Sequence, residues 1–430
     1  MKDHSKESKG WSNWSGSVRM HPGRTYLPRD VHELCHAVRG ARRIKVVGAG
    51  HSFAPLCETE GALLDLSGLD GTLELSATGD SAWVPAGWTL ERVSRALWDA
   101  GYSLANQGDI NTQSIAGLLA TGTHGTGQEL QCLSALAREF QMVLADGELV
   151  TCSPTLRPAL FEAQRVSLGM LGVVVRARLA VMPAYGLQER IESVAWNEIV
   201  ETYDQLALEN RHAEFWVFPY SDQVMLKTMQ PTAAFDEADK PQGPETLFRF
   251  VCETTAQYPE TAAPLQQMLT SLVRSRARSG ASHAIFPTQR TVRFEELEYE
   301  VPRAAGLAAL EEARRWIRKR SLPVAFPFEY RCTAGDDIWL SPFNLGPVAN
   351  ISAHQYFRMP WEPLFKDLER IFRAYGGRPH WAKRHSLSAD DVFELYPRAA
   401  DFCAVRAAVD PESKFVNRYL SELFALDRAR

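Results

Sequence analysis

The stretch IKVVGAGHSFAP, residues 44–55, decides how the first part of this chain folds. An apolar run rich in β-branched residues leads into Gly48-Ala49-Gly50, which is typical of a strand that enters a nucleotide-binding loop. The dinucleotide fingerprint needs a third glycine at position 53, where a helix packs against its strand, but this chain has Phe53 there. The loop therefore holds something other than a dinucleotide in the usual fold, and the role of His51 becomes the question.

Two more glycine clusters follow in the same half of the chain. They are GLLATGTHGTG at 117–127 and GMLG at 169–172. Glycine allows unusual backbone dihedrals and a close approach of the chain to a ligand. Three clusters in one domain predict backbone wrapped around a phosphate-bearing ligand.

The pattern of apolar residues divides the chain into parts. Residues 25–180 alternate short apolar runs with helical patterns, which favours an α/β arrangement. From about 185 to 375, longer helical patterns alternate with aromatic-rich strands such as EFWVFPY and FEELEYEVP, which predicts an antiparallel sheet covered by helices. The Pro/Gly/acid stretch 235–245 is expected to be a surface loop.

Composition favours a soluble globular protein. The chain has 430 residues, enough for two or three domains, with 45% hydrophobic and 23% charged residues. No segment has the long uncharged apolar run of a membrane span, so we expect no membrane partner. The start, MKDHSKESKG, lacks the apolar core of a secretory signal, so we expect a cytoplasmic protein.

The cysteines and the charges exclude further classes. Seven cysteines are scattered without a C-x-x-C pair, which predicts reduced thiols and neither a disulfide framework nor a zinc cluster. The net charge is −5, and the densest basic run, 314–320, closes a helical pattern whose dipole favours cations there. We therefore expect no nucleic-acid partner.

One motif resembles a metal site. His32-Glu33-Leu34-Cys35-His36 matches the H-E-x-x-H pattern of zinc proteases. However, Asp30 and Glu33 have the spacing of a capping box, and the apolar residues that follow have the spacing of an ordinary amphipathic helix. No third ligand stands at the usual short distance downstream, so we expect a capped helix here and no metal in the protein.

Four motifs in order resemble one family: VVGAGHSF at 46–53, QSIAGLLATGTHGTG at 113–127, the E-x-R of FEYRC at 328–332, and RPHWAKRH at 378–385. The chain resembles the aldonolactone oxidases, which belong to the vanillyl-alcohol-oxidase-type flavoproteins and include L-gulono-1,4-lactone, D-arabinono-1,4-lactone and alditol oxidases. The resemblance covers nearly the whole chain. It implies an α+β fold with a PCMH-type FAD-binding domain, residues 1–182 and 376–430, and a substrate (cap) domain, residues 183–375.

The resemblance also implies the cofactor and its site. FAD would be bonded covalently to His51, and the backbone of the loop before it would face the pyrophosphate, as an anion-binding nest does. The implied cofactor-binding residues are Val47, Gly48, Ala49, Gly50, His51, Ser52, Ser114, Gly117, Thr121, Gly122, Val174 and His380. Gly108 stands where family oxidases have glycine and related dehydrogenases alanine, which implies oxygen access to the flavin.

The catalytic residues are implied in the same way. Glu329 and Arg331 lie two apart in a strand pattern, so both side chains project from one sheet face. The resemblance assigns them, with Lys383, to catalysis and substrate binding, and Asp109 and Tyr356 to substrate binding. Relatives often carry serine in place of Asp109. Arg331 and Lys383 would stabilise the developing alkoxide, and either Glu329 or Lys383 would take the hydroxyl proton.

The implied reaction is oxidation of an aldono-1,4-lactone by hydride transfer to flavin N5, with oxygen as the acceptor and hydrogen peroxide as product. An alditol oxidase and a lactone dehydrogenase with another acceptor remain as alternatives, as do an unrelated NAD enzyme and a flavin-binding module without activity. We expect a monomer whose partners are a small sugar lactone or polyol and molecular oxygen.

Overall fold

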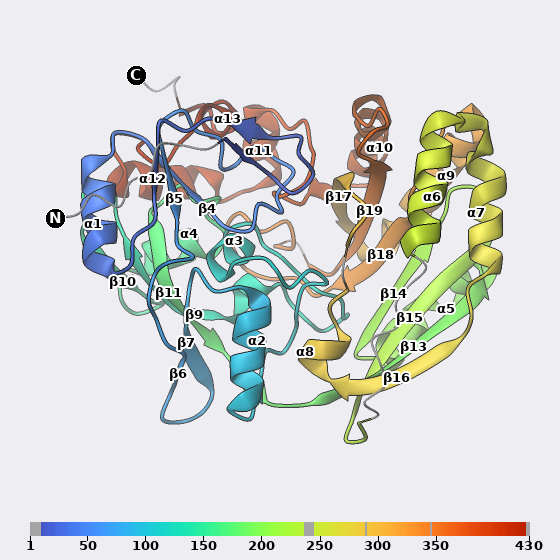
Figure 1. The fold of residues 1–430 in the computed structure, drawn as a ribbon, viewed down its shortest axis with the longest axis horizontal. Helices are drawn as coiled ribbons and strands as arrows, with labels where there is room; N and C mark the ends of the chain where they lie inside the picture. Colours follow the sequence, from blue (N-terminus) through green and yellow to red (C-terminus); the bar gives the residue numbers. More distant parts are fainter. Residues whose placement is uncertain (1–9, 236–244, 289, 345, 427–430) are drawn as a thin grey trace.

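The computed structural model describes residues 10–235, 245–288, 290–344 and 346–426. It has two bodies of mixed helix and sheet that face each other (Figure 1), in agreement with the expected α+β class. Most of the expected loop at 235–245 lies outside the described residues.

The IKVV run forms β4 (Ile44–Val47), at one edge of a three-stranded parallel sheet in the order β3 (Arg24–Tyr26), β5 (Ala62–Asp65), β4. Helix α1 (Val31–Gly40) connects β3 to β4 and shares an apolar cluster with this sheet through Leu34 and Val38. Because the strands are parallel, the glycine loop leaves from their carboxyl ends, where open α/β sheets bind ligands.

The H-E-x-x-H motif lies on α1, which begins as predicted. The Asp30 carboxylate caps the helix by accepting from the Glu33 N–H at 2.8 Å. Glu33 reaches one residue further back than in a capping box and accepts from the Arg29 N–H at 2.9 Å. His32 and His36 are both exposed.

A five-stranded antiparallel sheet completes the first body. Its order is β10 (Leu149–Cys152), β9 (Ala137–Val143), β11 (Val173–Ala180), β7 (Ser81–Pro85), β6 (Glu74–Leu75). One apolar cluster joins this sheet to α2 (Leu90–Asp99), α3 (Ile115–Ala120), η1 (Leu133–Leu136), α4 (Pro158–Arg165), α11 (Ala389–Leu395), α12 (Ala399–Val409) and α13 (Arg418–Leu423). Two short pairs, β1 (Trp11–Ser12) with β2 (Arg19–Met20) and β8 (Tyr102–Ser103) with β12 (Met182–Pro183), lie outside these sheets. The C-terminal helices thus return to the first body.

The second body is an eight-stranded antiparallel sheet covered by helices, as predicted. Its order is β16 (Arg276–Ala281), β13 (Gly186–Ala195), β15 (Gln223–Thr232), β14 (His212–Val217), β18 (Phe328–Thr333), β19 (Val348–Tyr356), β17 (Phe294–Pro302), β20 (Arg378–Pro379). Its helices are α5 (Trp196–Glu209), α6 (Glu245–Gln257), η2 (Pro259–Thr261), α7 (Ala262–Ser271), α8 (Ser282–Ile285), η3 (Arg303–Ala305), α9 (Gly306–Arg320) and α10 (Glu362–Ala374).

The two faces of this sheet differ in chemistry because side chains alternate along each strand. One face is apolar and packs under α5, α9 and α10 through residues such as Leu297, Tyr330 and Ile351. The alternate positions are polar yet buried, and they include Glu296, Glu298, Glu329, Arg331, Asn350 and His354. A polar face is tolerated without water only if its groups pair with one another or with a ligand, so this face marks the site.

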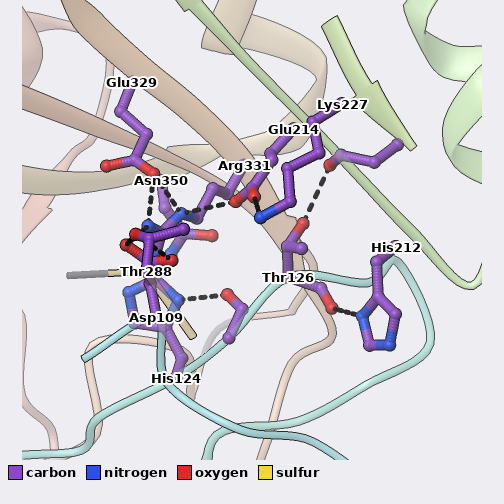
Figure 2. A network of polar contacts seen from close by, with 12 residues as sticks. Asp109, His124, Thr126, His212, Glu214, Lys227, Thr288, Glu329, Arg331 and Asn350 are labelled. Atoms are coloured by element: carbon purple, nitrogen blue, oxygen red, sulfur yellow. Dashed lines mark hydrogen bonds and ion pairs between the residues drawn. The ribbon is translucent and has the colours of Figure 1, made fainter. Parts of the chain in front are cut away.

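The glycine-rich loop at 122–127 fastens the two bodies together. The Gly127 N–H donates to the carbonyl of Cys332 at 2.8 Å, and the Thr126 hydroxyl donates to the carbonyl of Ala213 at 2.8 Å. His212 then donates from Nδ1 to the Thr126 carbonyl at 2.6 Å, which Figure 2 shows. The loop that the motif assigns to the cofactor therefore also contacts β14 and β18.

The predicted division at 182/183 and 375/376 stays a prediction, but two segments bear on where it would fall. Strand β20, at 378–379, pairs with β17 of the large sheet. Conversely, Ile338, Leu340 and Phe343 pack in the apolar cluster of the first body.

Among the described residues, no helix is long and apolar enough to cross a membrane.

Candidate active site

A cavity of about 310 Å³ lies at the carboxyl ends of the parallel strands. Its wall combines the loop after β4, the start of α3 and the turn before β11. The predicted cofactor residues on this wall are Val47, Gly48, Ala49, Gly50, His51, Ser52, Ser114, Gly117, Thr121 and Val174. These three segments, far apart in the sequence, thus meet around one cavity.

The lining of this cavity fits FAD. A side chain at position 48 would place Cβ 2.2 Å from Ser114 Oγ, and Gly50 has a positive φ of 71°, so both positions require glycine. The Gln164 side-chain oxygen is buried at the cavity with no hydrogen-bond partner among the described residues. A bare backbone loop and an unsatisfied polar atom are what a bound phosphate-bearing ligand would cover.

His51 lies where this cavity meets a second one. It lines both cavities, and Gln113 does so too. The imidazole stacks on Trp14 with ring centroids 5.6 Å apart, and Nε2 shares a hydrogen bond of 2.8 Å with the Thr112 hydroxyl. Burial, and then the charge of Lys383, lower the pKa of His51 to about 4, against the pull of Glu296. The ring is therefore neutral at neutral pH. Its contact to Thr112 is made by Nε2 and does not involve Nδ1.

The second cavity, of about 70 Å³, lies under the polar face of the large sheet. Of the predicted residues, it brings together Gly108, Asp109, Glu329, Arg331, His380 and Lys383. A side chain at Gly108 would place Cβ 3.1 Å from Thr123 Cγ2, so a larger residue here would press on Thr123, which lines the same cavity.

Glu329 and Arg331 form a buried ion pair on β18. Arg331 donates from Nε to Glu329 Oε1 at 2.9 Å, and Nε also lies 3.1 Å from Glu214 Oε2 (Figure 2). Burial raises the pKa of Glu329, and the negative charges of Glu214 and Asp109 raise it as well. Arg331 and Arg290 lower this pKa, but it stays above its ordinary value. Among the carboxyl groups that line this cavity, Glu329 thus binds a proton most readily, and it lies beside the guanidinium of Arg331.

Lys383 lies on the opposite side, in the turn after β20. Its Nζ is 2.5 Å from Glu296 Oε2 and 3.5 Å from Glu298 Oε2. Burial lowers its pKa, but Glu296 and Glu298 more than reverse this, so the pKa of Lys383 is raised. The group is an ammonium, and the same contact lowers the pKa of Glu296 to about 2 despite its burial.

The turn that carries Lys383 is hydrogen-bonded to the end of the glycine loop that follows β4. The Phe53 N–H donates to the carbonyl of Ala382 at 2.7 Å. His380 accepts at Nδ1 from the Ala382 N–H at 3.1 Å, and burial lowers its pKa to about 3, so it is neutral with its proton on Nε2. His380 therefore presents a donor to the second cavity, and it lies there rather than on the first.

Two predicted residues line neither cavity. Tyr356 packs in an apolar cluster with Phe53, Phe294 and Phe326, because β19 has passed beyond the polar part of the sheet at this point. A Cβ at Gly122, whose φ is 74°, would point toward Val166 and away from both cavities. Both residues lie outside the two cavity linings, and their predicted contacts with substrate and cofactor stay predictions.

Sequence reasoning missed the glutamates of β17 and the histidines that face them. Glu298 Oε1 lies 2.7 Å from His124 Nε2, and Glu296 Oε1 lies 3.4 Å from His354 Nε2. All four line the second cavity, as does Arg290. The signal was available in FEELEYE, where glutamates recur at every second residue, as one face of a strand requires.

Comparisons with known proteins agree with this arrangement. The profile described as D-arabinono-1,4-lactone oxidase matches residues 177–423, more than half of the chain, and an FAD binding domain profile matches residues 22–153. The chain is 35% identical to L-gulono-1,4-lactone dehydrogenase of Mycobacterium tuberculosis, over 95% of this chain and 97% of the relative. It is 27% identical to L-gulonolactone oxidase of Mus musculus (98% and 99% covered) and 30% identical to alditol oxidase of a Streptomyces species (96% and 98% covered).

Solved structures agree in fold. A solvent-stable cholesterol oxidase has a TM-score of 0.83 at 18% identity, and cholesterol oxidase from B. sterolicum has 0.84 at 17%, each covering 97% of both chains. These structures confirm the expected two-part fold with its FAD-binding domain. With family profiles matching both parts and a relative at 35% identity over nearly its full length, the chain belongs to the D-arabinono-1,4-lactone oxidase family of FAD-dependent oxidoreductases.

Proposed function

We propose that this enzyme oxidises an aldono-1,4-lactone, with FAD attached covalently through His51 and molecular oxygen as electron acceptor. The observation that carries the proposal is the meeting of two cavities at His51, one lined by the glycine loops and the other by Glu329, Arg331 and Lys383. A neutral, half-buried imidazole suits a covalent bond, because its nitrogen lone pair is available. The names of the relatives support a lactone.

The residues of the second cavity have separate roles in this proposal. When bound, FAD supplies the acceptor for the hydride that leaves the carbinol carbon. Lys383 and Arg331 stabilise the negative charge that develops on the substrate oxygen, since both stay protonated at neutral pH. Lys383 cannot also accept a proton, so Glu329 takes the hydroxyl proton.

The acceptor and the substrate each have a second candidate. The position of Gly108 in the lining of the second cavity supports oxygen as acceptor, whereas the name of the M. tuberculosis relative favours another acceptor. The Streptomyces relative favours an alditol as substrate.

All seven cysteines are free thiols, which supports the cytoplasm as location. We also propose a monomer, to be tested by light scattering of the purified enzyme.

The first experiment measures the flavin and then the reaction. Acid precipitation of the purified enzyme should leave yellow colour in the washed pellet, and His51→Ala should lose it to the supernatant. The native enzyme is then given aldono-1,4-lactones and alditols in air while peroxide is recorded. Peroxide formation with lactones supports the proposal. Flavin reduction without peroxide would replace oxygen by another acceptor, and colour that stays in the H51A pellet would overturn the tether.

A further inference from the structure

Asp109 lies in the second cavity with its carboxylate already engaged. Both oxygens accept from the Thr288 hydroxyl at 2.8 Å, and Oδ2 lies 2.5 Å from Arg290 Nη2. Figure 2 shows Asp109 and Thr288 against each other beside Arg331, whose Nη2 is 4.0 Å from the same carboxylate. Asp109 is therefore held in place by Thr288 and Arg290, and its predicted contact with the substrate stays a prediction.

The backbone holds this arrangement in place. The Thr288 N–H donates to the carbonyl of Asp109 at 3.0 Å, and the Arg290 Nη1 donates to the Thr288 hydroxyl at 2.5 Å. The contacts with Asp109 and Thr288 hold Arg290, whose side chain is only 28% exposed, against the cavity wall. A fixed guanidinium loses little side-chain entropy when it binds a ligand.

Arg290 offers a specific chemistry to the cavity. A guanidinium has five N–H donors and no acceptor, and the contacts to Asp109 and Thr288 use one hydrogen on each Nη. Its charge is balanced by Asp109, and that of Arg331 by Glu329 and Glu214. This end of the cavity thus presents donors without a large net charge, which suits a neutral acceptor such as a carbonyl oxygen better than an anion.

We propose that Arg290, anchored by Asp109, donates a hydrogen bond to the ring carbonyl of the lactone and makes the enzyme prefer lactones to alditols. An alditol has no carbonyl oxygen to accept from Arg290, only hydroxyl groups whose hydrogens must turn away from these donors, so it gains less from this contact. Asp109 is then a positioning residue for Arg290. This inference rests on the proposed function and names the group on the substrate that is recognised.

The test compares kcat/KM for a lactone and for an alditol of the same carbon number. Arg290→Gln should lower the lactone to alditol ratio at least tenfold, mostly through KM for the lactone, with the flavin content unchanged. Asp109→Asn should shift the ratio in the same direction, since it removes the anchor, and Arg290→Lys should give an intermediate loss. Arg293→Gln, at an exposed position of the same segment that lines neither cavity, is the matched control and should leave the ratio unchanged.

The outcomes separate this inference from the proposed function. If the native enzyme oxidises neither lactones nor alditols, the proposed function fails. If it oxidises lactones, and R290Q changes both substrate classes equally or neither, the proposed function stands and the role of Arg290 is refuted. Binding of a lactone, measured by the change in the flavin absorption spectrum of the oxygen-free holoenzyme with a slowly reacting lactone, should weaken by the same factor as KM rises.

Discussion

Glu329 and Lys383 lie in one cavity and the pKa of each is raised, but this leaves Lys383 a firm cation and makes Glu329 a better proton acceptor. Lys383 faces two carboxylates and keeps its proton, while Glu329 is buried beside Glu214 and Asp109, which favour its neutral form. Surroundings of this kind distinguish the proton acceptor, Glu329, from the electrostatic stabiliser, Lys383. The sequence alone left these two roles open, because burial and partners are not written in a motif.

This separation predicts the pH dependence of the reaction. The carboxylate of Glu329 is the active form, and its pKa is raised above 4.5, so kcat/KM should rise with pH through that raised pKa. Glu329→Gln should lower kcat by about 10²- to 10⁴-fold and remove this acid limb. Stopped-flow measurement of flavin reduction across pH checks both effects. An E329Q enzyme that keeps the acid limb would assign the proton acceptor to another group.

At the scale of the element, β17 shows how far the sequence could be interpreted. The loop at 47–52 and the pair Glu329 and Arg331 could be predicted because each is a contiguous motif. The alternation in FEELEYE predicts that its glutamates share one face of a strand but not that this face is buried at the site, since such alternation is equally typical of a strand with one exposed face. Only the first body, packed on that face, buries it. The position of Tyr356 outside the cavity lining could not be predicted either, because its strand continues past the cavity into an apolar cluster.

Neighbouring glutamates of β17 should respond oppositely to the same substitution. Glu298 is ionised beside His124 and Lys383, which lower its pKa well below 4.5 despite burial. Burial and the charge of Glu298 raise the pKa of Glu300 well above 4.5. We expect Glu298→Gln to lower the free energy of unfolding by about 3 kcal/mol at pH 7, because it removes a charged partner from the Lys383 ammonium and from His124.

Glu300→Gln should instead stabilise the protein, and increasingly so at higher pH. Above pH 4.5 the unfolded chain releases the Glu300 proton while the folded protein keeps it, so the free energy of unfolding of the native protein falls as pH rises. Glutamine removes this loss. Urea unfolding at pH 5.5 and pH 8 measures the difference between E300Q and the native protein, which should grow between the two. A constant difference would mean that Glu300 is ionised in the folded state.

At the scale of the whole molecule, the loop at 122–127 ties the FAD cavity to the large sheet. Thr126 and Gly127 bond to β14 and β18, while His124 reaches Glu298 on β17. The loop lines the second cavity through Thr123 and His124, and Thr121, which directly precedes the loop, lines the first. The site therefore depends on how the two bodies are fastened, and a change in this loop should affect both cavities at once.

Gly125→Ala tests this dependence. A Cβ at Gly125 would lie 2.2 Å from the Gln107 carbonyl oxygen and 2.3 Å from Asn106 Oδ1, which itself accepts from the Gln107 N–H at 2.9 Å. Neither atom is the end of a free side chain, so the loop must move, and His124 and Thr126 move with it. We expect a loss of about 2–3 kcal/mol in urea unfolding, together with weaker flavin retention and a higher KM. Gly40→Ala, where a Cβ meets nothing within 4 Å, should change the free energy of unfolding by less than about 1 kcal/mol. If G125A matches G40A in stability while the flavin and KM are unchanged, the loop does not join the two bodies in the way that its hydrogen bonds indicate.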